Sequence, residues 1–277
     1  MKTAKELLAN AKRLSFGCDE LDKATNGGIP FFPVTEIAGE AGVGKTQLLL
    51  GLALTCQLST TEGGLGGGCL YLSTEGPVPI ARLQTYLQER PDLCEKLGEK
   101  NALDGVLIED RIPDAETLWR TLCDKLPIVL SAGHIKLVII DSIAAVFRGE
   151  FSGRNGMQDR NGWYFGLSNI MKRLHADYDC MFVLANQVSS RLDTGENVPA
   201  LGLSWASSIN QRFFIEFSND SSSAEQSAII GLTDVSPRRR VLSVQFSPCL
   251  PCGVVKDSCV VSRRGFHALP SPCTDDR

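Results

Sequence analysis

The stretch Gly39-Glu-Ala-Gly-Val-Gly-Lys-Thr46 decides the fold that this sequence predicts. It matches the pattern G-x-x-x-x-G-K-[ST], in which small residues let backbone N–H groups close around phosphates. Residues 34–38 before it are mostly apolar and predict a strand. Residues 47–58 after it are apolar nearly all round, which predicts a buried helix. Strand, loop and helix in this order are the context that the phosphate-binding pattern requires.

The residues of this loop also indicate which cofactors it would bind, namely ATP and Mg²⁺. Lys45 would supply a point charge to the β- and γ-phosphates, and Thr46 would offer its hydroxyl to the metal ion. The residues predicted to bind ATP in this segment are Gly39, Glu40, Ala41, Gly42, Val43, Gly44, Lys45, Thr46 and Gln47.

A second acidic residue on the metal side is expected at the end of a buried strand. Leu137-Val-Ile-Ile-Asp141 fits, and Asp141 would hold Mg²⁺ through its water shell. Ser142 follows, where helicase-type or AAA-type sites carry Glu, so the base that activates water must lie elsewhere. Glu75, after the apolar residues 70–74, lies at the same edge of the predicted sheet. The alternative for Glu75 is an exposed loop carboxylate.

The rest of the chain alternates strands with helices, which predicts a mainly parallel sheet covered on both faces. Strands are expected at residues 69–73, 105–109, 136–141 and 180–186, and helices at 80–89, 115–126 with a continuation to 131, and 163–174. Pro127 should kink or divide the helix around it. Later strands, at residues 213–217, 227–230, 241–246 and 259–262, predict an antiparallel extension.

Composition restricts the other possibilities. The chain has 277 residues, a net charge of −4 and ten cysteines scattered through apolar runs, which favours reduced cysteines acting as small hydrophobic residues. A single pair, Cys249-Leu-Pro-Cys252 near Cys259, is weak evidence for zinc. No run approaches the length of a membrane span, and the first residues resemble no leader, so we expect no membrane partner and a cytosolic or nuclear location. Any contact with DNA must depend on local basic patches.

These motifs, in this order, resemble the RecA family, specifically the eukaryotic strand-exchange recombinases and their paralogues. The matching segments are residues 39–47, Tyr71-Leu-Ser-Thr-Glu-Gly76, Val138-Ile-Ile-Asp-Ser142, Ala185-Asn-Gln-Val188 and Ser247-Pro-Cys-Leu-Pro251. Residues 14–22, 144–151 and 198–206 resemble the X-ray repair cross-complementing branch of those paralogues. The resemblance implies a RecA-like P-loop ATPase core over residues 15–269, after a linker or amphipathic helix at 1–14 and before a flexible tail at 270–277.

The resemblance also implies roles for individual residues. Glu75 aligns with the glutamate that polarises the attacking water. Gln187 aligns with the glutamine that senses the γ-phosphate and passes its state to the following DNA-binding loop. Arg82 falls where a family arginine stacks on adenine. Residues 151–159 align with the first DNA-binding loop and 188–199 with the second, which makes Arg154, Arg160 and Arg191 the expected phosphate contacts. The alternative is that these arginines form only a solvated rim. Ser247, Pro248, Leu250 and Pro251 resemble a cap over nucleotide bound by a neighbouring subunit.

Departures from the family pattern shape the functional prediction. The second loop is short, no Phe-x-x-Ala segment precedes the core, and residues 1–14 match only the end of a linker to the usual N-terminal helical domain. We therefore expect a nuclear subunit, with a possible cytoplasmic pool, that pairs with another RecA-type paralogue as a heterodimer. It would act on single-stranded or branched DNA and assist recombinase filaments in double-strand break repair, as a weak, partner-dependent ATPase. The alternatives are a self-sufficient strand-exchange ATPase and an assembly subunit that binds nucleotide without turnover.

Overall fold

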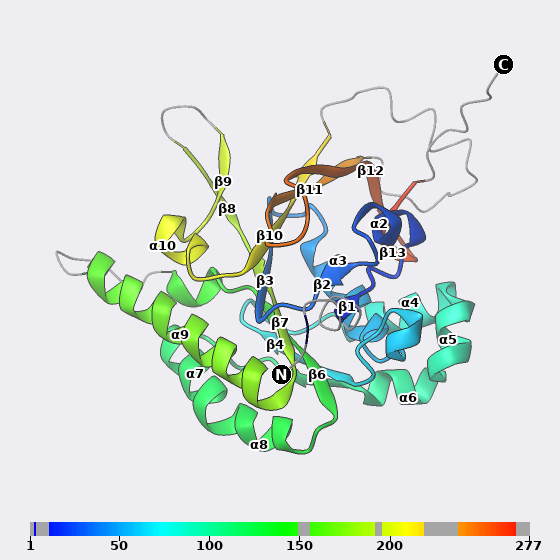
Figure 1. The fold of residues 1–277 in the computed structure, drawn as a ribbon, viewed down its shortest axis with the longest axis horizontal. Helices are drawn as coiled ribbons and strands as arrows, with labels where there is room; N and C mark the ends of the chain where they lie inside the picture. Colours follow the sequence, from blue (N-terminus) through cyan, green and yellow to red (C-terminus); the bar gives the residue numbers. More distant parts are fainter. Residues whose placement is uncertain (1–2, 4–10, 149–155, 192–195, 219–237, 270–277) are drawn as a thin grey trace.

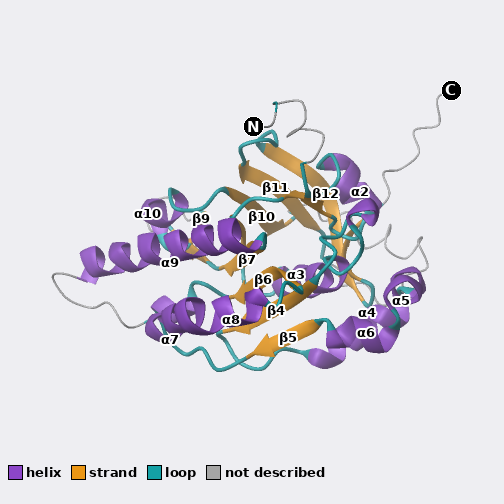
Figure 2. Cartoon of the chain, turned by 60° about the horizontal axis from the view of Figure 1, so that its bottom comes forward, coloured by secondary structure: helices purple, strands orange, loops and turns teal. Residues whose placement is uncertain are grey.

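The computed structural model describes residues 3, 11–148, 156–191, 196–218 and 238–269. A central sheet lies between two layers of helices (Figures 1 and 2). Within the described residues this sheet has nine strands. In spatial order they are β13 (Gly265–Ala268), β12 (Gly253–Ser262), β11 (Arg240–Phe246), β10 (Gln211–Phe217), β3 (Val34–Gly39), β7 (Met181–Asn186), β6 (Ile135–Asp141), β4 (Gly68–Ser73) and β5 (Val106–Glu109).

The type of pairing between neighbouring strands changes once across this sheet, from parallel to antiparallel at β10. From β10 to β5 the neighbouring strands are parallel, and from β10 to β13 they are antiparallel. The mainly parallel sheet with a C-terminal antiparallel extension is therefore confirmed. The extension begins at β11, because β10 pairs in parallel with β3. The strand predicted at residues 227–230 lies outside the described residues.

Helices cover both faces of the sheet (Figure 2). One face packs against α2 (Asp19–Ala24), α3 (Lys45–Thr55), α4 (Ile80–Glu89), α5 (Pro91–Leu97) and α6 (Glu99–Asp104). The other packs against α7 (Ala115–Arg120), the π-helical segment η2 (Thr121–Lys125), α8 (Leu126–Ser131), α9 (Gly156–Tyr178) and α10 (Gly202–Ala206). Shorter elements are β1 (Arg13–Leu14), β2 (Ile29–Pro30), η1 (Thr60–Glu62), η3 (Ala145–Phe147), β8 (Val188–Ser190) and β9 (Asn197–Pro199).

The apolar strand β6 explains why two cores form. Its side chains alternate between the faces, so Leu137 and Ile139 join one core and Val138 and Ile140 join the other. All four are fully buried. An uninterrupted apolar run from Leu137 to Ile140 is thus required, as the sequence predicts for a sheet covered on both faces.

Several predicted boundaries differ from the structure. Leu14 lies in β1, where it pairs with Ile29, because a fully buried leucine gains more from this pairing than from a surface helix. Residues 1–2 and 4–10 of that predicted helix lie outside the described part. The helix predicted around Pro127 is divided into α7, η2 and α8, with proline in the first turn of α8. Helix α9 is longer than predicted, and α5, α6 and α10 were not predicted.

Nothing in the described part of the chain resembles a membrane span, since none of its helices is both long and apolar enough. The nine cysteines described there are free, and four of them are buried, namely Cys56, Cys69, Cys180 and Cys259. Cys249 and Cys252 are exposed on the loop between β11 and β12.

The register of the parallel strands brings four strand ends to one edge of the sheet. Ser73 of β4 pairs with Asp141 of β6, and Ala38 of β3 pairs with Asn186 of β7. In a parallel sheet, the loops that follow the carboxyl ends of neighbouring strands lie close together at one edge. The loops after these four strands carry the predicted nucleotide-site residues.

Candidate nucleotide-binding site

The phosphate loop runs from Gly39, the last residue of β3, directly into α3. Gly42 and Gly44 have φ values of 74° and 111°, a left-handed region that glycine enters without steric cost. A Cβ at Gly39 would lie 2.3 Å from the backbone oxygen of Ile215 on β10. The glycines therefore serve both the shape of the loop and the close approach of a neighbouring strand.

Lys45 lies inside this loop rather than in solvent. Its Nζ donates to the backbone oxygens of Gly39 and Glu40, each at 2.8 Å. Burial lowers the pKa of Lys45, while the negative charges of Asp141, Glu75 and Glu40 oppose that shift. An ammonium held in a loop of backbone N–H groups can pair with phosphate oxygens.

Asp141, at the end of β6, contacts two hydroxyl groups. Its Oδ2 accepts from Thr46 Oγ1 at 2.7 Å and from the Tyr71 hydroxyl at 2.6 Å. Burial raises the pKa of Asp141, and these two hydrogen bonds oppose the shift. A hydroxyl beside a carboxylate suits Mg²⁺, which in nucleotide sites takes one or two protein ligands and completes its shell with phosphates and water. Thr46 and Asp141 therefore fit this ion, and sequence reasoning missed Tyr71.

Glu75, just after β4, is the acceptor of three side-chain donors. Its Oε1 accepts from Ser142 Oγ at 2.8 Å, from Arg148 Nη2 at 2.9 Å and from Gln187 Nε2 at 2.6 Å. The structure thus brings together Glu75 and Gln187, two residues that the sequence assigned to one site. Ser142 and Arg148 were missed, since no local pattern indicates contacts over such sequence separations.

Two strands, β8 and β9, form a hairpin in the segment assigned to the second DNA-binding loop. The backbone N–H of Ala200 donates to the oxygen of Gln187 at 2.8 Å, which closes the base of the hairpin. Asn197 Nδ2 donates to Glu40 Oε1 in the phosphate loop at 2.7 Å. Hydrogen bonds therefore join the hairpin to the phosphate loop at Glu40 and close its base at the backbone oxygen of Gln187.

A buried polar cluster lies behind the phosphate loop. Glu36 of β3 is fully buried and accepts from Asn186 Nδ2 at 2.7 Å and Trp205 Nε1 at 2.6 Å. Arg212 of β10 completes it with an ion pair to Glu36. Burial raises the pKa of Glu36, with the Arg212 charge as the leading opposing effect. This cluster, which the sequence did not predict, joins four elements behind the phosphate loop, namely β3, β7, α10 and β10.

Arg82 and Gln47, both predicted to bind ATP, contact each other. Arg82 Nε donates to Gln47 Oε1 at 2.7 Å, and the guanidinium also donates to the backbone oxygen of Ser262. The guanidinium carbon lies 4.8 Å from the centre of the Tyr86 ring. Stacking of Arg82 on adenine stays a prediction.

The three arginines predicted to bind DNA have different surroundings. Arg154 lies outside the described residues. Arg160 lies on α9, and its charge opposes the burial effect that raises the pKa of the nearby Tyr164. Arg191 is exposed and lies directly after β8. Residues 156–159, assigned to the first DNA-binding loop, belong to the first turn of α9 instead.

The predicted cap follows β11. Its Leu250 is buried and Pro248 and Pro251 are exposed. Ser247 Oγ donates to Gln211 Oε1 at 3.2 Å. Two exposed prolines leave this segment accessible to a second subunit, and its role as a cap stays a prediction.

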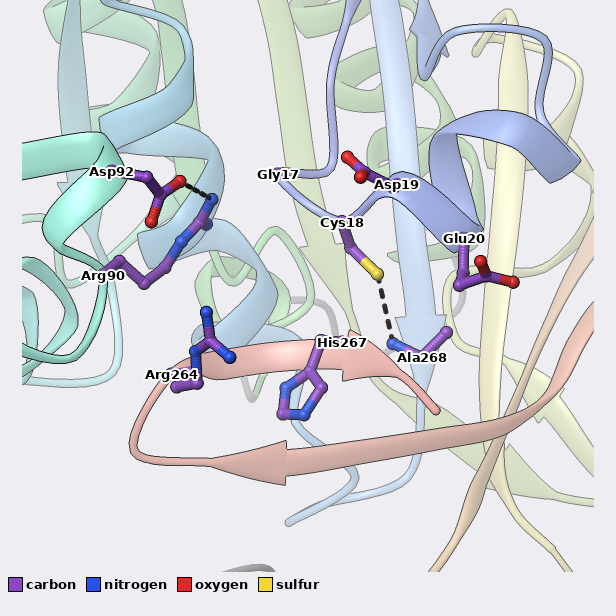
Figure 3. A pocket seen from close by; sticks show the side chains of 9 residues that line it. All are labelled: Gly17, Cys18, Asp19, Glu20, Arg90, Asp92, Arg264, His267 and Ala268. Atoms are coloured by element: carbon purple, nitrogen blue, oxygen red, sulfur yellow. Dashed lines mark hydrogen bonds and ion pairs between the residues drawn. The ribbon is translucent and has the colours of Figure 1, made fainter. Parts of the chain in front are cut away.

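A separate cavity of about 370 Å³ lies between the end of α4, the loop before α2 and β13 (Figure 3). Arg90, Arg264 and His267 line it together with Asp19 and other acidic residues. Burial lowers the pKa of His267, and the charges of the two arginines act in the same direction. None of the residues predicted to bind nucleotide or metal lines this cavity.

The parallel sheet, with a phosphate loop after β3 and acidic residues at the adjacent strand ends, defines a RecA-like P-loop protein. The comparison with protein families identifies the family within this class. The chain belongs to the Rad51 family, whose profile matches residues 9–201.

Curated relatives refine the position within this family. The DNA repair protein XRCC3 homolog of Arabidopsis thaliana is 31% identical over 298 residues, covering 93% of this chain and 93% of its own length. The DNA repair protein XRCC3 of Bos taurus is 32% identical over 270 residues, covering 94% of this chain and 75% of its own. RAD57 of Saccharomyces cerevisiae is 40% identical over 176 residues, 62% of this chain and 37% of its own. The predicted resemblance to the X-ray repair cross-complementing branch is confirmed.

Proposed function

We propose that this chain binds ATP with Mg²⁺ and hydrolyses it slowly as a subunit that acts with a second RecA-type paralogue. Members of the Rad51/RecA family are DNA-dependent ATPases that bind ATP with Mg²⁺. The observation that carries the proposal for this chain is one set of contacts at the sheet edge. Thr46 is hydrogen-bonded to Asp141, and Glu75 to Gln187.

In this proposal each residue has one chemical task. Lys45 and the loop N–H groups hold the phosphates, and Thr46 and Asp141 hold Mg²⁺, which when bound offsets charge on the phosphate oxygens. Glu75 accepts a proton from water while the water oxygen bonds to the γ-phosphorus and the bond to the bridging oxygen breaks. ADP and inorganic phosphate leave, and Glu75 returns the proton to solvent. The site therefore needs a Glu75 oxygen that can accept from water.

Gln187 would report the nucleotide state to the β8–β9 hairpin. Its side chain lies at Glu75 and its backbone oxygen accepts from Ala200, while Asn197 contacts Glu40. A γ-phosphate that attracts Gln187 would shift the base of the hairpin. Identical protease cleavage of the hairpin with and without nucleotide would contradict this.

Family membership and the exposed cap segment support the partners and the location that we propose. We propose a heterodimer with another paralogue, in which residues 247–251 cap the neighbour's nucleotide and Arg82 stacks on adenine. The XRCC3 and RAD57 relatives are named as DNA repair proteins, which supports nuclear action on single-stranded or branched DNA together with recombinase filaments in homologous-recombination repair. A net charge of −4 leaves DNA affinity to local arginines such as Arg154, Arg160 and Arg191.

The first experiment measures ATP turnover by the purified chain, with and without single-stranded DNA. Glu75→Gln serves as the blank and Lys45→Ala as the binding control. We expect tight ATP binding with turnover only slightly above the blank, rising when the partner is added. Strong DNA-stimulated turnover without a partner would instead indicate a self-sufficient motor. Turnover equal to the blank in every mixture would indicate an assembly subunit that only binds nucleotide.

A further inference from the structure

We propose that Arg148 is a positioning residue that pairs with the Glu75 carboxylate as its counter-ion and thereby keeps Glu75 inactive. Phosphates of single-stranded DNA would compete for the Arg148 guanidinium and so release Glu75. The proposal deepens the function above and rests on Glu75 acting on water. It concerns how DNA regulates hydrolysis at that site.

The starting observation is that three donors converge on one carboxylate oxygen. Ser142, Arg148 and Gln187 all donate to Glu75 Oε1, at distances of 2.6 to 2.9 Å. An oxygen that accepts several donors, one of them a permanent cation, is a poor acceptor for water. Oε1 can therefore accept from a water molecule only after at least one of these three donors leaves.

Ser142 is not the donor that leaves. It is only 1% exposed. Its backbone N–H donates to Thr74 Oγ1, and Thr74 Oγ1 donates to its backbone oxygen, both at 2.8 Å. These reciprocal bonds fix Ser142 at the end of β6, where its hydroxyl orients Glu75 in every state.

Arg148 is the donor that can leave at low cost. Its side chain is 57% exposed, and that of Glu75 is 40% exposed. An ion pair with this exposure contributes little free energy, so a competing anion can break it. Because a guanidinium keeps its charge at all physiological pH values, departure of Arg148 removes a full positive charge from beside Glu75.

The location of Arg148 indicates phosphates of DNA as the competing anion. Arg148 follows η3 directly and lies three positions before residue 151, where the segment 151–159 begins that the family resemblance assigns to the first DNA-binding loop. Guanidinium groups bind phosphate through paired hydrogen bonds, and a DNA strand presents many phosphates at once. A strand bound near this arginine would therefore draw it away from Glu75.

The test compares Arg148→Gln with Arg148→Lys and with Arg120→Gln. Arg120→Gln breaks an exposed ion pair to Glu116 on the α7 surface and is the matched control. Without DNA, Arg148→Gln should raise ATP turnover up to about fivefold, the upper range for an exposed ion pair. Addition of oligothymidine should then stimulate it little further. Arg148→Lys should keep the low basal rate, and Arg120→Gln should match the unaltered protein. Basal turnover of Arg148→Gln at or below that of the unaltered protein would overturn the proposal.

A second measurement tests the competition between Glu75 and DNA for Arg148 even if no variant turns over ATP, an outcome that would count against the proposed hydrolysis. Fluorescence anisotropy reports the affinity for labelled oligothymidine without any turnover. Glu75→Gln frees Arg148 from its counter-ion and should tighten DNA binding by about threefold to fivefold. In the Arg148→Gln background the same Glu75→Gln change should have no effect. Equal affinity of Glu75→Gln and the unaltered protein would refute the competition between Glu75 and DNA.

Discussion

Replacement of Glu36 by glutamine should destabilise the protein by about 3 to 5 kcal/mol, because it leaves the Arg212 guanidinium buried without a counter-ion. The exposed fractions of the two side chains are 0% for Glu36 and 8% for Arg212. Glutamine keeps the Oε1 atom that accepts from Asn186 and Trp205. The substitution therefore changes mainly the contact with Arg212, which then faces an amide N–H group.

The raised pKa of Glu36 determines what a second substitution should do. Burial is its largest cause, so the attraction of Arg212 does not fully offset desolvation of the carboxylate. Removal of both charges should cost less than removal of one. Arg212→Leu in the Glu36→Gln background should therefore recover about 2 kcal/mol.

Urea unfolding measured by fluorescence and circular dichroism tests both expectations. With a urea dependence of about 2 to 3 kcal/mol per molar, Glu36→Gln should lower the midpoint by roughly 1 to 2 M. Glu216→Gln, at an exposed position on β10, is the control and should change stability by less than about 0.5 kcal/mol. A loss below about 1 kcal/mol for Glu36→Gln, or a double variant as unstable as the sum of its single changes, would refute the reasoning.

Three further predictions concern the site and the separate cavity. Lys45→Ala should weaken ATP binding by about tenfold to a hundredfold in calorimetry, since a charge-assisted contact is lost; unchanged affinity would exclude Lys45 from the phosphates. Asn197→Ala removes the bond to Glu40 and should speed proteolysis of the hairpin severalfold with a global stability change below about 1 kcal/mol; equal cleavage rates would contradict the link. The pKa of His267 is lowered in the folded protein, so the contribution of neutral His267 to the free energy of unfolding is present above pH 6.5 and is lost as pH falls through the folded-state pKa. His267→Gln should therefore reduce the fall in melting temperature between about pH 7 and pH 5. An unaltered slope of melting temperature against pH would contradict this role of His267.

Local patterns in the sequence predicted the parts of this fold that local physics decides. The glycine pattern predicted the phosphate loop because backbone shape limits which residues fit there. The apolar run before Asp141 predicted both a strand buried on two faces and the edge at which its carboxylate lies. The helix at residues 80–89 was predicted with the boundaries that α4 has.

Contacts between distant positions could not be predicted in this way. Arg148 and Glu75 lie 73 positions apart, and Gln187 and Glu75 lie 112 apart. No periodicity records which side chains meet at a sheet edge, because strand order and register decide it. The short strand β1 was missed for the same reason, since its two residues become a strand only through pairing with β2. The contacts within the Glu36 cluster and the hydrogen bond from the Tyr71 hydroxyl to Asp141 also join distant positions, and local patterns did not predict them.

The register of β6 has an evolutionary consequence. Its residues alternate between two cores, and its last residue must stand opposite Ser73 for Asp141 to reach Thr46. Exchange of one apolar side chain for another changes only local packing and can accumulate over time. Deletion of a single residue would move every later side chain into the opposite core and shift the carboxylate from the sheet edge. This strand should therefore vary freely in apolar composition among descendants while its length remains constant.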